Sequence, residues 1–260
     1  MKIYINADSR NRTAKNTEKQ LKEKSDELNL EIVRDISEAD VVVSIGGDGT
    51  FLKSARLSES KPIIGINMGT LGYLTEISKN NIEQSITAIK NRDYHTEERM
   101  MLEGEIIRQN GERVEIPPAL NEIGLVKNTL GVVRFEVSVN ERTITSYTAD
   151  GILVCTPTGS TAYNLSCGGP IVDPTAEIIT LTPVAPHTII NRSIVLADTS
   201  TVEIKITELR ENTHAFIIYD GHPIEVFSED TVRIKKSEKI TKIIKLEERS
   251  FIDSIREKIS

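Results

Sequence analysis

A glycine-rich turn that directly follows an apolar run constrains the fold of this chain more than any other feature. The turn is Gly46-Gly47-Asp48-Gly49-Thr50, and it lies between the apolar residues 41–45 and the helix-like residues 51–57. This order predicts a strand, a turn and a helix. Glycines let a backbone approach a ligand closely, and the N–H groups of a helix's first turn favour negative charge. Residues 46–50 therefore indicate a cradle for a phosphate-like anion.

Asp48 is the unusual residue of this cradle. A carboxylate placed beside a bound phosphate is repelled unless it binds a metal ion or takes a proton, which makes Asp48 a candidate catalyst. The alternative is a tight strand-to-helix connection in which Asp48 only caps the helix. A lone glycine-rich turn does not separate the two interpretations.

The composition limits the ligands that the chain can bind. The net charge is −7, there is no Trp, and aromatic residues make up 4% of the 260 residues. Such a surface repels nucleic acids and anionic membranes and offers few platforms for stacking bases. An anionic ligand must then be held locally by backbone amides, a few cations or a metal ion, which makes magnesium a candidate partner.

The cysteines and the N-terminal residues indicate the compartment. Cys155 and Cys167 are the only cysteines, without a CxxC pattern, so neither a disulfide framework nor a zinc site is expected. Residues 1–6 look like a short strand rather than a signal sequence, and no run approaches the ~20 apolar residues of a membrane span. We expect a cytoplasmic protein with reduced thiols.

Residues 1–96 alternate strand-like and helix-like segments. The runs 41–45 and 63–66 are almost wholly apolar, as in strands buried on both faces. The pattern predicts an α/β domain with a parallel sheet, and a second glycine turn, 67–73, at the same carboxyl edge as the cradle. The predicted elements are strands at 2–6, 40–45 and 62–67 and helices at 17–28, 49–57 and 82–90.

Residues 97–246 consist of short alternating runs, such as 134–139, 202–206 and 231–235, which predict a β-rich, sandwich-like second domain. The tail is helical again, with Ser250 as a cap, and we expect this C-terminal helix to pack back on the first domain. The predicted domains are 1–96 with 247–260, and 97–246.

Residues 148–170 form the densest run of hydroxyl and glycine residues. This run predicts a loop and helix start that contact a base, an amide or ribose hydroxyls, with Tyr163 available to stack. A serine hydrolase is disfavoured, because Ser160 lacks a GxSxG elbow and the run holds no His.

Three dipeptides keep two interpretations each. Asp150-Gly151 lies between strand-like runs and fits either a type I′ hairpin turn or a ligand position. Asp220-Gly221 has the same pattern without ligand-like neighbours, which favours a turn. Asn121-Glu122 could hold the vicinal diol of a ribose or form a solvated turn.

Taken together, these segments resemble the NAD kinase family. The resemblance covers essentially the whole chain and keeps the family's order. GGDGT also occurs in diacylglycerol and sphingosine kinases, whereas TPTGSTAY followed by GGPIV is specific. A P-loop and the protein-kinase motifs are missing. The matching segments are 46–50, 69–74, 121–122, 149–151, 156–163 and 168–172.

The resemblance implies transfer of the terminal phosphoryl group of ATP, or of polyphosphate, to the 2′-hydroxyl of the adenosine ribose of NAD. It implies Asp48 as the general base, a divalent cation such as Mg²⁺, NAD bound between the domains, and a homodimer or homotetramer. His222 departs from the family, whose members often carry Gln there. The residues implied in binding ATP and NAD are Gly46, Gly47, Gly49, Thr50, Lys53, Gly72, Tyr73, Asn121, Glu122, Asp150, Thr158, Thr161, Ala162, Tyr163 and Ser166.

Two other functions stay open on the sequence. A lipid kinase of the diacylglycerol type would share the cradle, but it needs an apolar acyl groove, and nothing in the sequence supplies one. A non-catalytic NAD(P) sensor would keep the fold, but such a protein would be expected to have lost the aspartate of the cradle. In this chain the aspartate, Asp48, is present.

Overall fold

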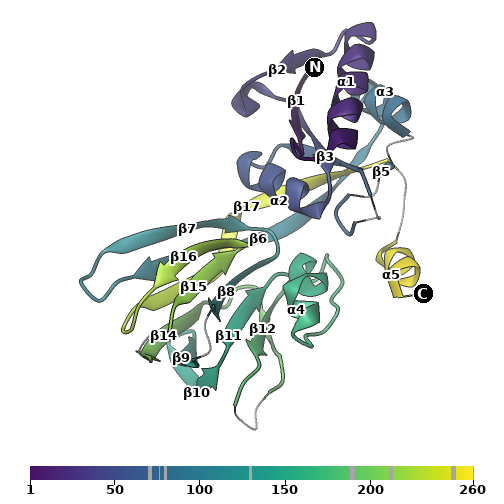
Figure 1. Ribbon diagram of the computed structural model, residues 1–260. Helices are drawn as coiled ribbons and strands as arrows, with labels where there is room; N and C mark the ends of the chain where they lie inside the picture. Colours follow the sequence, from purple (N-terminus) through teal and green to yellow (C-terminus); the bar gives the residue numbers. More distant parts are fainter. Residues whose placement is uncertain are drawn as a thin grey trace. The chain divides into compact units, whose positions relative to one another are not determined.

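The parallel sheet predicted for the N-terminal part is present in a computed structural model of the chain (Figure 1). The structure describes residues 1–69, 72–75, 77–78, 81–128, 131–187, 191–210, 213–246 and 250–259. The chain divides into unit 1, which is Met1–Arg99 with Ile240–Ser260, and unit 2, which is Met100–Lys239. Both domain types expected from the sequence are confirmed.

Unit 1 contains a sheet of the order β2-β1-β3-β4-β17 in which every described pairing is parallel, and β5 pairs with β4. Strands β6 (His95–Ile107) and β17 (Thr231–Lys245) contribute residues to both units. The other elements of unit 1 are β1 (Lys2–Ala7), α1 (Arg12–Glu27), β2 (Glu31–Val33), the 3-10 helix η1 (Ile36–Glu38), β3 (Val41–Gly46), α2 (Asp48–Leu57), β4 (Pro62–Asn67), β5 (Ile77–Ser78), α3 (Ile82–Asn91) and α5 (Phe251–Ile259).

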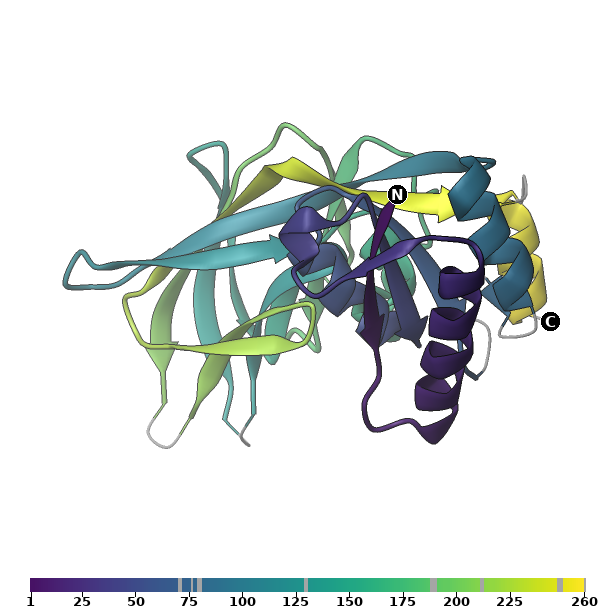
Figure 2. The ribbon, with the colours of Figure 1, turned by 90° about the horizontal axis from the view of Figure 1, so that it is seen from above.

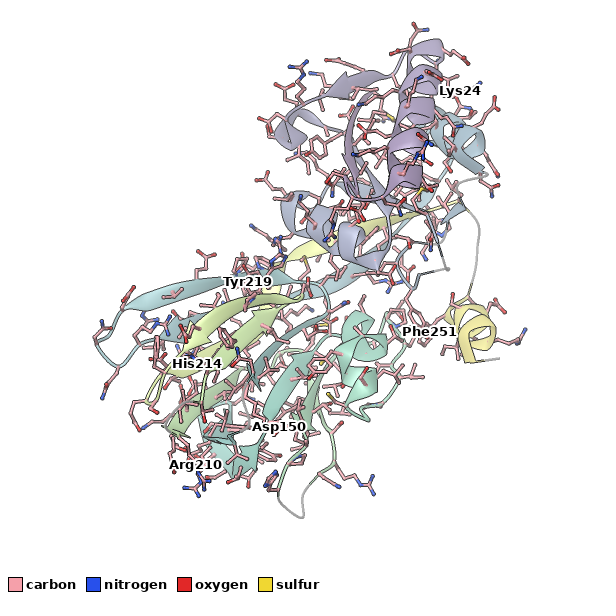
Figure 3. The ribbon with its side chains drawn as sticks, viewed as in Figure 1. Lys24, Asp150, Arg210, His214, Tyr219 and Phe251 are labelled. Atoms are coloured by element: carbon pink, nitrogen blue, oxygen red, sulfur yellow. The ribbon has the colours of Figure 1, made fainter. Side chains whose placement is uncertain are left out.

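Helices cover both faces of this sheet (Figure 2). On one face, alternate residues of β3 and β4 form a core with α1 and α3, which are joined by the ion pair between Lys24 (Figure 3) and Glu83. On the other face, the Phe51 ring of α2 packs against Gly65 of β4. Strands buried on both faces explain the continuous apolar runs in the sequence.

Helix ends follow local capping. Asn11 caps α1 by accepting hydrogen bonds from the N–H groups of Thr13 and Ala14, so this helix begins at Arg12, five residues before the predicted start at 17. The predicted cap of the last helix is confirmed, because the N–H of Asp253 donates to the Ser250 hydroxyl. Among the described residues, no helix combines the length and the apolar character that a bilayer crossing needs.

Unit 2 is built from two antiparallel sheets. One has the order β13-β12-β11-β8-β15-β16, and the other joins β10, β9, β14, β17, β6 and β7. The strands are β7 (Arg113–Ala119), β8 (Glu122–Lys127), β9 (Val133–Val139), β10 (Arg142–Ala149), β11 (Gly151–Cys155), β12 (Ile178–Val184), β13 (Ile194–Ala197), β14 (Val202–Leu209), β15 (Ala215–Tyr219) and β16 (His222–Val226), and the short helices are η3 (Thr158–Thr161) and α4 (Tyr163–Ser166).

The two sheets of unit 2 enclose one apolar core. Alternate residues of their strands, including Phe135, Ile204, Leu125 and Val154, are fully buried in it. This packing of two sheets face to face is the pattern of a sandwich, and β11 of the first sheet is buried on its other face as well. The predicted β-sandwich-like domain is therefore confirmed.

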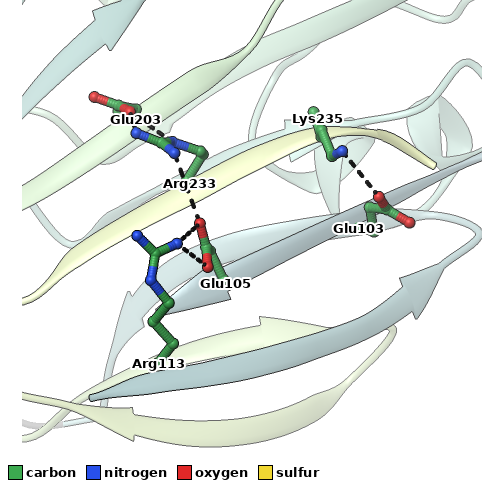
Figure 4. Close-up of polar contacts among 6 residues, drawn as sticks. All are labelled: Glu103, Glu105, Arg113, Glu203, Arg233 and Lys235. Carbon is green, nitrogen blue, oxygen red and sulfur yellow. Dashed lines mark hydrogen bonds and ion pairs between the residues drawn. The ribbon is translucent and has the colours of Figure 1, made fainter. Parts of the chain in front are cut away.

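A ladder of ion pairs crosses the strands β14, β17, β6 and β7 of unit 2 (Figure 4). Arg233 joins Glu203 to Glu105, and Arg113 pairs with the same Glu105. Lys235 pairs with Glu103 in the same region. All of these residues except Glu203 line a surface hollow of about 450 Å³, whose cations each face a carboxylate. The ladder therefore stabilises the sheet modestly and does not present an excess of one charge to a ligand.

The two Asp-Gly dipeptides have different structures. Asp220-Gly221 forms the turn between β15 and β16, with φ angles of 45° and 80°, as predicted. Asp150-Gly151 is not a hairpin turn, because β10 pairs with β9 whereas β11 pairs with β8 and β12 in the other sheet. The hairpin interpretation of Asp150-Gly151 is wrong, because β10 and β11 do not pair with each other but enter different sheets.

We expect Gly151→Ala to destabilise unit 2. A Cβ at this position would lie 2.0 Å from the carbonyl oxygen of Leu125, and such overpacking costs about 1–3 kcal/mol. Urea unfolding measures the loss. The control is Gly69→Ala, because no atom of the described residues lies within 4 Å of its Cβ position, so its unfolding free energy should stay within about 0.5 kcal/mol of the wild type. Equal effects of the two substitutions would contradict the packing argument.

Candidate active site

Asp48 is the first residue of α2, and its side chain is held from outside the helix. Oδ2 accepts a hydrogen bond from the N–H of Tyr73 at 2.9 Å, and Oδ1 accepts from the N–H of Leu74 at 3.2 Å and the Thr75 hydroxyl at 3.1 Å. Gly47 is the N-cap, so Asp48 does not cap its own helix. The interpretation of Asp48 as a simple cap is therefore wrong, and its carboxylate joins the two glycine turns of unit 1.

The glycines of the cradle have different structural reasons. A Cβ at Gly46 would lie 2.3 Å from the Thr50 hydroxyl, so this glycine is required by internal packing. Gly47 and Gly49 have no described atom within 4 Å of a Cβ, which leaves their backbone accessible to a ligand. A Cβ at Gly72 would lie 2.0 Å from Oδ1 of Asp48. Gly72 is thus the residue that lets the second turn reach the carboxylate.

The remaining predicted residues of unit 1 lie on α2 or in the second turn. Thr50 is in the first turn of α2, whereas Lys53 is exposed one and a half turns along the same helix. Tyr73 donates its backbone N–H to Asp48. Thr70 and Leu71 of the second turn lie outside the described residues.

In unit 2, the backbone of residues 120–122 is bonded on both sides. On one side, the Thr156 hydroxyl donates to the carbonyl of Leu120 at 2.6 Å, and the Thr156 N–H donates to the carbonyl of Asn121 at 2.9 Å. On the other, the Asp220 carboxylate accepts from the N–H groups of Leu120 and Asn121, each at 2.8 Å. Three segments that are far apart in sequence thus meet at the dipeptide Asn121-Glu122.

The serine- and threonine-rich segment after β11 is packed closely onto this dipeptide. A Cβ at Gly159 would lie 2.1 Å from the carbonyl oxygen of Asn121, so only glycine fits there. Asn164 of α4 is fully buried and donates to the carbonyls of Ser160 and Pro170. The Thr182 hydroxyl donates to its Oδ1. These bonds fix the loop 156–172 as one rigid piece.

The carboxyl of Glu122 is buried and electrostatically unusual. Glu122 is 5% exposed, and its Oε2 atom has no hydrogen-bond partner among the described residues. Burial raises the pKa of Glu122 to about 8, with the negative charge of nearby Asp220 adding to the effect. Glu122 is therefore mostly a neutral acid at pH 7, able to donate as well as to accept a hydrogen bond.

The other predicted residues of unit 2 lie around α4. Asp150, labelled in Figure 3, pairs with Lys127 at 2.7 Å. Tyr163 is 39% exposed at the start of α4. Burial raises the pKa of its phenol most, and Cys167, Asp150 and Glu122 raise this pKa further. Tyr163 therefore lies near both predicted carboxylates. The remaining predicted residues are Thr158 and Thr161 in η3, Ala162 between the helices and Ser166 at the end of α4.

The sequence interpretation missed three residues that build this arrangement. Asp220 was expected only to form a turn, Thr156 only to belong to a hydroxyl-rich run, and Asn164 was not singled out. Their side chains bond to backbone groups, so no local pattern distinguishes them. The one available signal was the Asp-Gly dipeptide at 220–221, which marked the turn but not the target of its carboxylate.

Comparisons with known proteins identify the family of the chain. Residues 2–94 match the ATP-NAD kinase N-terminal domain, and residues 120–246 match the ATP-NAD kinase C-terminal domain. The chain is 40% identical over 228 residues to the NAD kinase of Caldanaerobacter subterraneus subsp. tengcongensis, covering 86% of this chain and 80% of the relative. The chain therefore belongs to the ATP-NAD kinase family.

Two solved structures are similar over nearly the whole chain. The NAD kinase of Archaeoglobus fulgidus, solved in complex with ATP, has a TM-score of 0.79 and 26% identity, and the match covers 98% of each chain. Yeast NADH kinase, solved with NADH, has a TM-score of 0.90 at 22% identity, covering all of this chain and 87% of the yeast chain. The yeast structure confirms the fold.

We expect the buried Glu122 to make stability fall as the pH rises. Between its ordinary pKa of 4.5 and the raised value of about 8, the folded protein binds a proton that the unfolded chain does not. The unfolding free energy should therefore fall by about 1.4 kcal/mol per pH unit relative to Glu122→Gln, which cannot titrate. Urea unfolding of both proteins at pH 5.5, 6.5 and 7.5 measures this difference. A constant difference across that range would show that Glu122 has an ordinary pKa.

Proposed function

We propose that this protein is an NAD kinase that transfers the terminal phosphoryl group of ATP to the 2′-hydroxyl of the adenosine ribose of NAD, which yields NADP. The observation that carries the proposal is the Asp48 carboxylate, oriented by three donors beside an open glycine cradle. Family membership supports the reaction, and the ATP complex of the Archaeoglobus relative supports ATP as the donor. Inorganic polyphosphate is a second donor to be tested in the same assay.

Asp48 is proposed as the general base. A carboxylate has about four acceptor positions, and the donors from residues 73–75 occupy one on Oδ2 and two on Oδ1. One position on Oδ2 is then left for the ribose hydroxyl, whose proton it would take as the hydroxyl oxygen attacks the phosphorus atom. Gly47, Gly49 and the first turn of α2 would hold the phosphates of ATP.

Unit 2 is proposed to supply the recognition of NAD. Asn121 and Glu122 are presented by a fixed backbone, and Tyr163 offers a half-exposed ring for stacking. Asp150 and the hydroxyls of Thr158, Thr161 and Ser166 would contribute further contacts.

Magnesium is proposed to bind together with the ATP phosphates. In the part of the chain that the structure describes, no three side chains of His, Cys, Asp or Glu form a metal-binding group. Mg²⁺ commonly keeps several waters and takes other ligands from substrate phosphates, which fits an ion that arrives with ATP at the open cradle of Gly47 and Gly49. The ion supplies neutralisation of the phosphate charge.

We also propose that the protein acts in the cytoplasm as a homodimer or homotetramer. Its two cysteines, one of them buried, support a reducing compartment, and the oligomer follows from the family resemblance. Light scattering coupled to size-exclusion chromatography distinguishes a dimer from a tetramer. The lipid-kinase and sensor alternatives are not favoured by the family match.

We expect Asp48→Asn to lower turnover at least about 100-fold, the low end of general-base contributions, while NAD binding persists. NADP formed from NAD, ATP and Mg²⁺ is quantified with an NADP-specific dehydrogenase. The matched control is Thr75→Val, which keeps the carboxylate and removes one of its three donors, so its turnover should stay within about tenfold of wild type. Near wild-type turnover of Asp48→Asn would remove Asp48 from the mechanism, and a wild type that binds NAD without forming NADP would favour the sensor.

We expect Gly49→Ala to separate stability from donor binding. Gly49 is the second residue of α2, where alanine should raise the unfolding free energy by about 0.5–1 kcal/mol. Its methyl group would occupy the open space proposed for the ATP phosphates, so the KM for ATP should rise several-fold while that for NAD changes little. A stabilised variant with an unchanged KM for ATP would place the phosphates elsewhere.

A further inference from the structure

The turn between β15 and β16 carries a carboxylate that faces the backbone of the candidate NAD site. Asp220 lies 100 residues after Leu120 in sequence, yet its carboxylate accepts the N–H groups of Leu120, Asn121 and Glu122 at 2.8, 2.8 and 3.4 Å. Its own N–H donates to the carbonyl of Glu122 at 3.2 Å. The register of β8 with β15 brings the turn to this place, because Tyr219 lies opposite Ile123.

These bonds complete the hydrogen bonding of a backbone that carries two predicted ligand residues. Thr156 donates to the carbonyls of Leu120 and Asn121, so all six N–H and C=O groups of residues 120–122 have partners. The backbone groups of residues 120–122 therefore do not need the side chains of Asn121 and Glu122 as hydrogen-bond partners. The direction in which these two side chains point is therefore set by Thr156 on one side and Asp220 on the other.

From this geometry we propose that Asp220 is a positioning residue for NAD: it fixes the bend at 120–122 and thereby the direction in which Asn121 and Glu122 present their side chains to the nucleotide. The inference rests on the proposed function. It assigns Asp220 no contact with NAD, only an action through Asn121 and Glu122.

The groups around Glu122 are consistent with an acid form. Asp220 faces it from the β15–β16 turn, Cys155 from β11, and Tyr163 and Cys167 from α4 and its C-terminal end. Each of these groups is neutral or negative, so none offers a positive charge that would stabilise an ionised Glu122 carboxylate. The Oε2 atom of Glu122 is buried and has no hydrogen-bond partner among the described residues, which disfavours a negative charge on it.

Asp220→Asn tests the proposal, with Asp230→Asn as the matched control. Asp230 is another turn carboxylate of unit 2, buried where Asp220 is half-buried. It accepts the N–H of Phe227 at 2.9 Å and an Arg108 hydrogen bond at 2.6 Å, away from residues 120–122. We expect Asp220→Asn to raise the KM for NAD about tenfold, with kcat and the KM for ATP within twofold of wild type, because charge-assisted hydrogen bonds orient the bend. Asp230→Asn should leave kcat, the KM for NAD and the KM for ATP unchanged.

The pH profile adds a readout that a purely structural role would not move. In the wild type, the KM for NAD should rise above about pH 8 as Glu122 loses its proton, and Glu122→Gln should bind NAD at pH 7 and remove this rise. In Asp220→Asn the rise should begin at a somewhat lower pH, because the negative charge that adds to the effect of burial on the pKa of Glu122 is gone. An unchanged profile and KM in Asp220→Asn, or a Glu122→Gln variant that loses NAD binding at pH 7, would overturn the proposal.

Hydrogen exchange measured by mass spectrometry separates this inference from the proposed function. The amides of Leu120 and Asn121 should exchange at least about tenfold faster in Asp220→Asn than in the wild type. If Asp220→Asn does not fold, the same measurement is made on Asp220→Ser. A wild type that forms no NADP but shows this change would refute the proposed function and leave the positioning of the bend intact. Unchanged exchange at residues 120–122 would refute the positioning itself.

Discussion

The hydrogen bonds between the Asp48 carboxylate and residues 73–75 are the interaction on which the candidate phosphoryl-transfer site depends. A side chain at the first position of a helix would otherwise sample several rotamers in solvent. The three donors fix its direction, and Gly72 is required because any Cβ there would collide with Oδ1. The two glycine turns of unit 1 thus form one structure, in which the proposed general base is oriented before a substrate binds.

The candidate NAD site of unit 2 is held by the same kind of hydrogen bond, between side chains and backbone groups. Backbone groups of residues 120–122 are bonded by Thr156 and Asp220, so that the side chains of Asn121 and Glu122 are left for a ligand. Gly159 allows the loop to approach the bend, as Gly72 does at Asp48. In both units, hydrogen bonds between backbone groups and side chains hold in place a residue that is expected to contact substrate.

The sequence predicted the parts of the fold that depend on local pattern. The strand at 62–67 agrees fully with β4, and the strand at 40–45 agrees within one residue with β3, because both runs are apolar and buried on both faces. The three-residue strand β2 was missed, since so short a strand has no detectable period. The cradle and the Asn121-Glu122 dipeptide were recognised from motifs. What could not be predicted was long-range: the corner at Asp150, where consecutive strands enter different sheets, and the bonds of Asp220 to a bend 100 residues earlier.

A crystal structure of the protein with NAD and a non-hydrolysable ATP analogue tests the central claim most directly, because it measures the distance from Oδ2 of Asp48 to each ribose hydroxyl. The account predicts that the 2′-hydroxyl of the adenosine ribose lies within about 2.6–3.2 Å of Oδ2, with the three donors from residues 73–75 still in place. An adenosine ribose bound well beyond hydrogen-bond distance of Asp48, in a complex with both nucleotides present, would contradict the assignment of Asp48 as the base.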